Sequence, residues 1–399
     1  MFSSSVALAV LVAATPTGPE VTLEQAVALA LQDNTELKVM RSEVDVSQAA
    51  LGLAHPWSMP ELRVQFNNVE EIPTGQFQWY AGLSWKLPNP WEWSHGLDAA
   101  EARLLDSRFD LAARTWRVVK ELRLAWLDLS GAAAHEQLAR ETVEVRRKLL
   151  QVLRRRLEQG GGTQVELNLA QLGETDARQE QLRWQSARLK GAQSIAFLVG
   201  QPVTPLPATL ADSPPPLPEL EQLEARLERH PVLEALRARV AMAKAEEQTE
   251  AAKRLPWPEL QARVRNRAGA TPANNDFQLG LTVPLGVTPA PKLAVARATA
   301  ARNQAQLDAQ KAQSRSELRV LLSRAEGLRD RWRDFEQDYR ATLTSHRQLQ
   351  ARVLADGTLD PTLLLTADRQ ALELEHKRLE VQLDLARTLV ELEAVAGPP

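Results

Sequence analysis

The chain has 399 residues, with 48 Lys or Arg and 51 Asp or Glu, and its net charge of −3 provides no strong field to attract nucleic acid. Cysteine is absent, which excludes disulfides and thiolate metal sites within this sequence. No run approaches the roughly 20 consecutive apolar residues of a membrane-spanning helix.

Residues 1–21 are expected to be a signal or a disordered segment. An apolar stretch from Val6 to Leu11 is followed by the small residues Ala13 and Ala14, which is the pattern of a secretory signal and its cleavage site. The basic leading residues of such signals are missing, because the first Lys or Arg is Lys38. We expect export, with an apolar disordered tail as the alternative.

The remainder is predicted to be two copies of one unit. The tripeptide Pro60-Glu61-Leu62 recurs as Pro258-Glu259-Leu260, and the ending LVGQP of the first half corresponds to VAGPP at the end of the chain. Such self-similarity indicates a duplicated architecture. We expect a first repeat at 22–200, a proline-rich linker at 201–220 and a second repeat at 221–399.

Each repeat is predicted to contain a helix, a β-hairpin, a long helix, a tight tip and a returning helix. In the first repeat Asn34 is expected to break the first helix and cap its second piece, and in the second repeat Pro231 suits a first helical position. The long helix of the first repeat would extend roughly 90 Å. The expected first-repeat elements are helix 22–54, hairpin 60–88 with strands 61–68 and 76–87, helix 98–158, tip 159–163 and helix 163–199. The second-repeat elements are hairpin 258–286 with strands 259–267 and 276–285, helix 292–355, tip 355–361 and helix 362–396.

The long helix of the second repeat carries two tracks of residues at seven-residue spacing. Tracks sustained over this length indicate coiled-coil packing. One track contains Leu307, Ser314, Leu321, Leu328, Phe335, Thr342 and Leu349, and the other contains Leu318, Ala325, Trp332, Tyr339, His346 and Val353.

The four strands alternate apolar and polar residues, which fits strands of an outer-membrane barrel with an apolar outer face. Four strands cannot close a barrel, so several chains would have to combine their hairpins. A soluble sheet packed against helices is the alternative. The apolar faces contain Leu62, Val64, Phe66, Trp79, Ala81, Leu83, Trp85, Leu260, Ala262, Val264, Phe277, Leu279, Leu281 and Val283, and the polar faces carry Arg63, Arg263 and Arg265.

Tryptophan placement favours the membrane interpretation, because belts of Trp mark membrane interfaces. Six of the ten tryptophans lie in the strands or at their borders: Trp57, Trp79, Trp85, Trp91, Trp93 and Trp257.

The opening TLEQAVALALQDNTEL, the paired PEL strands and the turns Gly162-Thr163 and Gly357-Thr358 resemble the TolC-like outer-membrane efflux protein family. The resemblance implies a mainly helical homotrimer with a 12-stranded transmembrane β-barrel, four strands from each chain, continued by an α-barrel of coiled-coil hairpins. It implies an exit duct in the outer membrane, extending into the periplasm, for a tripartite efflux pump or a type I secretion system. Short strand-connecting loops at 70–75 and 269–275 resemble the heavy-metal or cation efflux branch most.

The same resemblance assigns the partners and the adaptor-contacting tips. The partners are a periplasmic adaptor, an inner-membrane transporter and outer-membrane lipid. From the strand alternation, Arg63, Arg263 and Arg265 would line the barrel lumen. Asp356 and Asp360, with Asp368, would ring the periplasmic mouth and select cations by their field, and a helix-capping role for Asp360 ahead of Pro361 is the alternative. The adaptor-contacting tips would be Gln159, Gly160, Gly161, Gly162, Thr163, Asp356, Gly357 and Thr358.

No catalytic or cofactor constellation is evident, so we expect a protein that is not an enzyme. The six histidines show no spacing of three or four residues, which argues against a helical metal site. A basic cluster before the first tip is either a solvated helix face or an adaptor-docking surface: Arg146, Arg147, Lys148, Arg154, Arg155 and Arg156. The rival function is a soluble, elongated periplasmic coiled-coil adaptor or scaffold.

Overall fold

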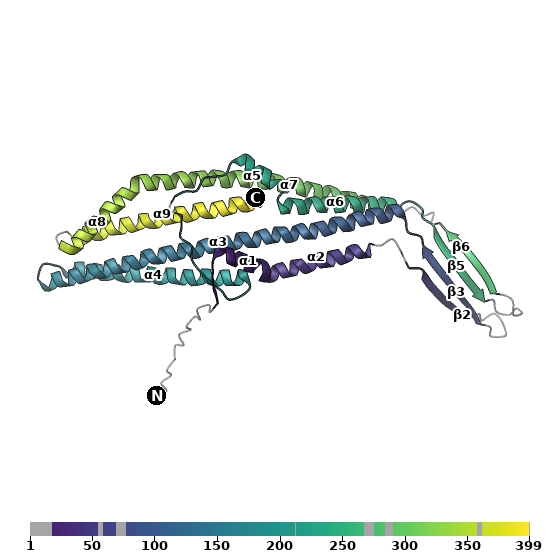
Figure 1. Cartoon of the computed structure of the whole chain (residues 1–399), viewed down its shortest axis with the longest axis horizontal. Helices are drawn as coiled ribbons and strands as arrows, with labels where there is room; N and C mark the ends of the chain where they lie inside the picture. Colours follow the sequence, from purple (N-terminus) through teal and green to yellow (C-terminus); the bar gives the residue numbers. More distant parts are fainter. Residues whose placement is uncertain are drawn as a thin grey trace, which may run out of the picture. The chain divides into compact units, whose positions relative to one another are not determined.

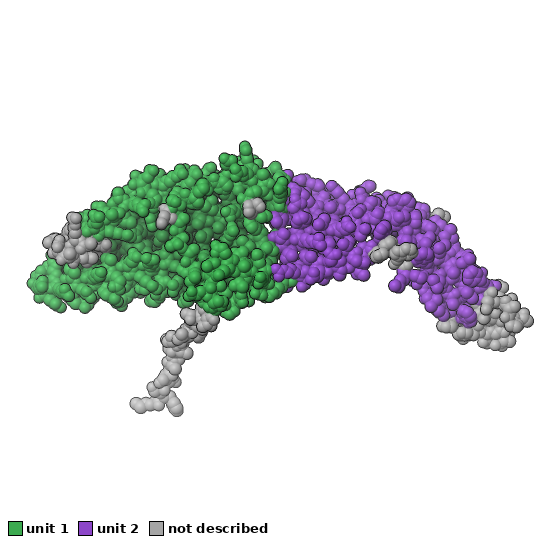
Figure 2. All heavy atoms as spheres, viewed as in Figure 1, with its two compact units in different colours: residues 1–38, 113–230, 314–399 green, residues 39–112, 231–313 purple. Residues whose placement is uncertain are grey.

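A computed structural model describes residues 18–54, 59–68, 77–211, 213–266, 275–283, 290–356 and 361–398. The chain divides into two compact units, each built from segments of both sequence halves (Figure 2). Unit 1 contains residues 1–38, 113–230 and 314–399, and unit 2 contains residues 39–112 and 231–313. Across the described residues, no helix combines the length and the apolar character needed to cross a bilayer.

The structure is mainly helical with a small sheet, as expected, and its long helices contribute to both units (Figure 1). The first half contains α1 (Leu23–Asp33), α2 (Thr35–Leu53), α3 (Pro90–Glu158) and α4 (Gln164–Val199). The second half contains α5 (Leu220–Leu227), α6 (Pro231–Ala252), α7 (Ala290–Asp334), a π-helical segment (Phe335–Tyr339), α8 (Arg340–Asp356) and α9 (Pro361–Ala396).

The predicted helix break at Asn34 is confirmed. Its side-chain oxygen accepts hydrogen bonds from the backbone nitrogens of Glu36 (3.0 Å) and Leu37 (3.2 Å), which caps α2. The amide nitrogen of the same side chain donates to the carbonyl of Leu198 at 2.8 Å. A single side chain therefore both starts α2 and ties it to the end of α4 within unit 1.

The second helical hairpin of unit 1 is held by the heptad residues. Leu318 and Ala325 on α7 are fully buried, and Trp332 packs in one cluster with Val381 and Leu385 of α9. Leu318, Ala325 and Trp332 all belong to the predicted track that begins at Leu318. Toward the far end of α8 the other track is less covered, since Leu349 is 52 % exposed.

Three local features differ from the sequence expectations. Helix α3 begins at Pro90 rather than residue 98, because Asn89 caps it by accepting from the backbone nitrogen of Trp91 at 3.1 Å. A π-helical segment at Phe335–Tyr339 interrupts the long helix expected at 292–355. A short parallel pair, β1 (Glu20–Val21) with β4 (Thr204–Pro205), lies where signal and linker were expected.

Unit 2 contains a four-stranded antiparallel sheet in the order β2 (Glu61–Asn68), β3 (Phe77–Lys86), β5 (Glu259–Asn266) and β6 (Asn275–Thr282). The four strands lie side by side in this order (Figure 1). The register pairs Leu62 with Leu83 and Leu83 with Ala262, whereas Arg63 lies opposite Gly82 and Gly82 opposite Arg263. Apolar residues therefore share one face of the sheet and polar residues the other, as the alternation predicted.

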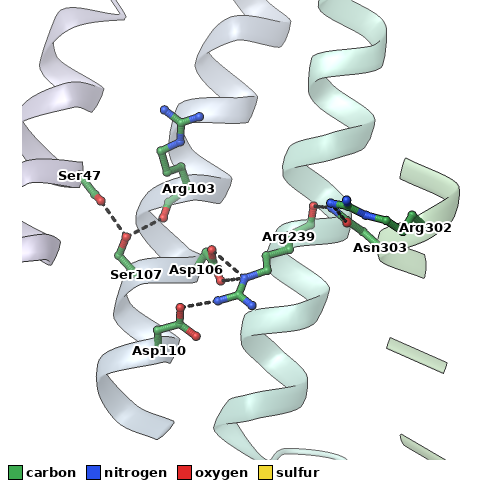
Figure 3. Close-up of polar contacts among 8 residues, drawn as sticks. All are labelled: Ser47, Arg103, Asp106, Ser107, Asp110, Arg239, Arg302 and Asn303. Carbon is green, nitrogen blue, oxygen red and sulfur yellow. Dashed lines mark hydrogen bonds and ion pairs between the residues drawn. The ribbon is translucent and has the colours of Figure 1, made fainter. Parts of the chain in front are cut away.

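The helices of unit 2 are linked by an arginine clamp (Figure 3). Arg239 of α6 forms ion pairs with Asp106, at 2.9 Å, and with Asp110, both on α3. Burial raises the pKa of Asp106, partly offset by Arg239. On the other side of α3, the hydroxyls of Ser47 and Ser107 lie 2.7 Å apart and join α2 to the same helix.

Replacing Leu385 by Ala should lower the free energy of unfolding by about 2–5 kcal/mol, because it leaves a cavity among fully buried residues. The matched substitution Leu349→Ala removes a half-exposed side chain and should cost far less. Denaturant unfolding of the purified variants measures both values. If both variants lost the same free energy of unfolding, the cluster around Leu385 would not be the main source of stability in this hairpin.

Candidate functional site

The first helical tip is a compact turn between α3 and α4. Gly160 has a φ of +76°, a conformation that glycine adopts without strain, and the Arg156 Nε donates to the carbonyl of Gly161 at 2.9 Å. Thr163 and Glu166 form a capping box, in which the Glu166 carboxylate accepts from the Thr163 nitrogen at 2.8 Å. These contacts fix the turn through its own backbone.

An apolar cluster supports the tip from below: Leu149, Leu150 and Leu153 of α3 with Leu167 and Ala170 of α4. The turn itself is largely exposed, with Gly162 half-buried. Rigid support under an exposed turn leaves residues 159–163 free to meet another molecule, although their assignment as adaptor contacts stays a prediction.

The second tip lies mostly outside the described residues. Helix α8 ends at Asp356, whose side chain is not described, and Gly357, Thr358 and Asp360 lie outside the described residues. The acidic ring of Asp356 and Asp360 therefore stays a prediction. Asp368 forms a buried ion pair with Arg146, at 3.0 Å, so that this carboxylate is neutralised inside unit 1.

The basic cluster before the first tip divides into two groups. Arg146 is committed to Asp368, and Arg147 contacts Glu144 at 3.1 Å. Arg147, Lys148, Arg154 and Arg155 are exposed, and Arg156 donates to the carbonyl of Gly161. Any docking role for this cluster falls to the exposed residues, whereas Arg146 and Arg156 stabilise unit 1 itself.

The polar face of the sheet gathers the three predicted lumen arginines. Arg63 and Arg263 lie on either side of Gly82 in the register, and the guanidinium of Arg265 lies over the Tyr80 ring at 5.3 Å. A shallow cavity of about 330 Å³ is lined by Arg63, Tyr80, Gly82, Ser84, Gln261 and Arg263 among others. The face is thus polar and hollowed, and Glu259 lines the same cavity as Arg63 and Arg263.

The sequence reasoning missed a histidine pair. His135 of α3 and His376 of α9 approach with their Nδ1 atoms 2.9 Å apart, so that one ring donates to the other, and Trp184 of α4 stacks on His135 at 4.2 Å. Burial is the main cause that lowers the pKa of His135 to about 4, and the charge of the neighbouring His376 is the second. Only the tertiary fold brings these residues together, because they are 241 positions apart.

The histidine pair does not extend into a larger ligand set. Within the residues that the structure describes, no group of three or more His, Cys, Asp or Glu side chains is arranged to hold a metal ion. The pair is therefore treated as a packing and hydrogen-bonding feature of unit 1.

Sequence comparison finds a family model that matches the first half of the chain. Residues 26–201 match the family model described as "Outer membrane efflux protein". The resemblance to the TolC-like outer-membrane efflux protein family is confirmed. Among curated proteins, no relative matches this sequence.

Solved structures extend the likeness along the chain. The CusC structure has a TM-score of 0.79 at 15% identity and covers 94% of this chain and 92% of its own. The outer-membrane channel OprN has a TM-score of 0.79 at 20% identity, and the match covers 94% of this chain and 90% of OprN. VceC of Vibrio cholerae has a TM-score of 0.77 at 17% identity, and the match covers 94% of this chain and 96% of VceC. At these identities the likeness establishes the fold, and with the family match it supports a role as an efflux channel.

Acid should weaken the packing around His135. Because the folded-state pKa is below the ordinary value of 6.5, the unfolded chain binds more protons between about pH 6.5 and 4, and stability falls as the pH falls through this range. We expect the variant His135→Gln to lose less stability than the unsubstituted protein between pH 7 and 4.5, measured by thermal unfolding.

The control is His95→Gln, which changes a histidine of α3 that lies near Asp98, at 3.6 Å, in unit 2. This variant should keep the pH dependence of the unsubstituted protein. Parallel stability profiles for His135→Gln and the unsubstituted protein would contradict the assignment.

Proposed function

We propose that the protein is the outer-membrane exit duct of a tripartite efflux pump or a type I secretion system and conducts substrate passively from the periplasm to the exterior. The observation that carries the proposal is the four-stranded sheet, with an apolar face, a polar face and two outer strands that each have one neighbour among the described residues. The family match supports the same role.

The sheet favours an oligomer of three chains. In a bilayer every backbone polar group must be paired, so the outer edges of β2 and β6 require neighbouring strands. Two chains would supply eight strands, a barrel whose interior is filled by side chains, whereas three chains supply twelve and leave room for a passage. Strands β2 and β6 run antiparallel to each other, so that β6 of one copy can pair with β2 of the next.

The exposed apolar side chains of the sheet fit contact with lipid. Leu279 and Leu281 of β6 are 76 % and 63 % exposed, and Leu62 on β2 is exposed on the same face. In water such a continuous apolar face is unfavourable, whereas it is the expected outer surface of a membrane barrel. This is the main argument against a soluble adaptor or scaffold.

The helical tips are the proposed contacts of a periplasmic adaptor, with an inner-membrane transporter supplying the energy. The exposed turn at 159–163, supported by a capping box and an apolar cluster, fits a docking element. We further propose that repeats 22–200 and 221–399 each supply one hairpin of strands and one of helices to the duct. Similar TM-scores to CusC and OprN give no preference for the heavy-metal branch.

The full-length protein should fractionate with outer membranes, and its detergent-corrected mass should be three times the chain mass of 44.3 kDa. The variant Leu279→Arg/Leu281→Arg should lose most membrane-inserted trimer, because Arg on the lipid face costs about 2–4 kcal/mol at the bilayer midplane.

The matched control Gln278→Arg/Thr282→Arg introduces the same charges on the opposite face of the same strand and should leave insertion intact. Light scattering and membrane fractionation measure both variants. Insertion lost only in the control variant would reverse the assignment of the two faces, and a soluble monomer of the unsubstituted protein would contradict the proposal.

A further inference from the structure

We propose that the polar face of the sheet makes the duct selective for anions through a cross-strand arginine row, defined as Arg63, Gly82 and Arg263. The inference rests on the proposed function, since it requires this face to line the passage. The register carries the first step, because Arg63 lies directly opposite Gly82 and Gly82 directly opposite Arg263. Two guanidinium groups therefore occupy one level of the sheet on alternate strands.

Gly82 makes this arrangement possible. A Cβ atom at this position would lie 3.0 Å from the Cγ of Arg263, so that any larger residue would displace the arginine stem. The close approach of the β3 backbone thus reserves the middle of the row for the flanking side chains. Absence of a side chain at the centre also opens the cavity of about 330 Å³ on this face.

Two carboxylates, Glu61 and Glu259, share this face with the row, and among the described residues neither forms a short ion pair with it. Arg263 donates to the neutral Gln261 side chain at 2.7 Å. The contact of Arg63 with Glu61 is 3.8 Å long, and both side chains are about three-quarters exposed, a geometry in which ion pairs contribute little. Arg265, one level away, lies over Tyr80 and opposite Asp276, so it adds less to the field of the row.

The surrounding side chains suit an anion. Tyr80 and Ser84 line the same cavity and offer hydroxyl donors beside the two arginines, whereas the Gln261 amide donates at 3.3 Å to Glu259, the one carboxylate among the described residues of the lining. Guanidinium groups bind carboxylate, sulfonate and phosphate oxygens in a planar, two-bond geometry and keep their charge over the whole physiological pH range. The class of solute that this face favours is therefore the small inorganic or organic anion.

Assembly of three copies would increase the positive charge around the passage. Three copies of the sheet would place six arginines of the row around the passage, two from each chain. Charges of one sign on low-dielectric walls concentrate counter-ions and set the selectivity of a pore. Because the strands fix the row, its contribution does not depend on movement of the helical tips.

The test is the reversal potential of the purified trimer in a planar lipid bilayer under a tenfold KCl gradient. The unsubstituted channel should prefer Cl⁻ to K⁺. In the variant Arg63→Gln/Arg263→Gln the Cl⁻ to K⁺ permeability ratio should fall by about tenfold, the lower end of the enrichment that a cleft of one charge sign provides. Light scattering of the same preparation verifies that the variant is trimeric.

The control variant Arg178→Gln removes an arginine of α4 that pairs with Glu174 on its own helix, and it should leave the ratio unchanged. The anion proposal is overturned if the trimer conducts but prefers K⁺. It is also overturned if the Cl⁻ to K⁺ permeability ratio is the same with and without Arg63 and Arg263. Neither result contradicts the proposed function as an exit duct. A protein that forms neither trimer nor conductance overturns the proposed function as well.

Discussion

The sheet of unit 2 has two outer edges, and the pairing of these edges is the constraint on which the proposed assembly depends. Strands β2 and β6 each have one neighbour among the described residues, and both belong to a sheet with an exposed apolar face. Unpaired strand edges are costly in a bilayer and prone to aggregation in water. In the proposed assembly, closure with further copies would pair the edges, place the apolar face against lipid and enclose the polar face.

The helices of each unit are tied together by a few polar side chains at their junctions. Asn34 starts α2 and binds the end of α4, Asn89 starts α3, and Arg239 joins α6 to two carboxylates of α3. Such contacts fix the relative register of long helices, which apolar packing alone leaves free to slide. In an oligomer, fixed helix registers within each chain would present the tips and strands of all copies at matching levels.

Much of this fold could be predicted from local sequence periodicity. Alternation around Leu62 and Leu260 located the strands and their faces, and the spacing of Leu318, Ala325 and Trp332 located the coiled-coil seam. The Asn89-Pro90 pair is a sequence signal for the start of α3, although the expected start was residue 98. The His135–His376 pair and the π-helical segment were beyond reach, because the first joins residues 241 positions apart and the second follows no helix-breaking residue.

The most direct test of the central claim is disulfide cross-linking between the outer strands. The chain has no cysteine, so a pair introduced at one of Glu61, Arg63 or Gln65 on β2 and one of Gln278, Gly280 or Thr282 on β6 reports on that contact alone. Closure predicts that at least one pair gives oxidised dimers and trimers on denaturing gels, ending at the trimer, with none from either single cysteine. Monomers in every pair, or a ladder that continues past the trimer, would contradict closure by three copies.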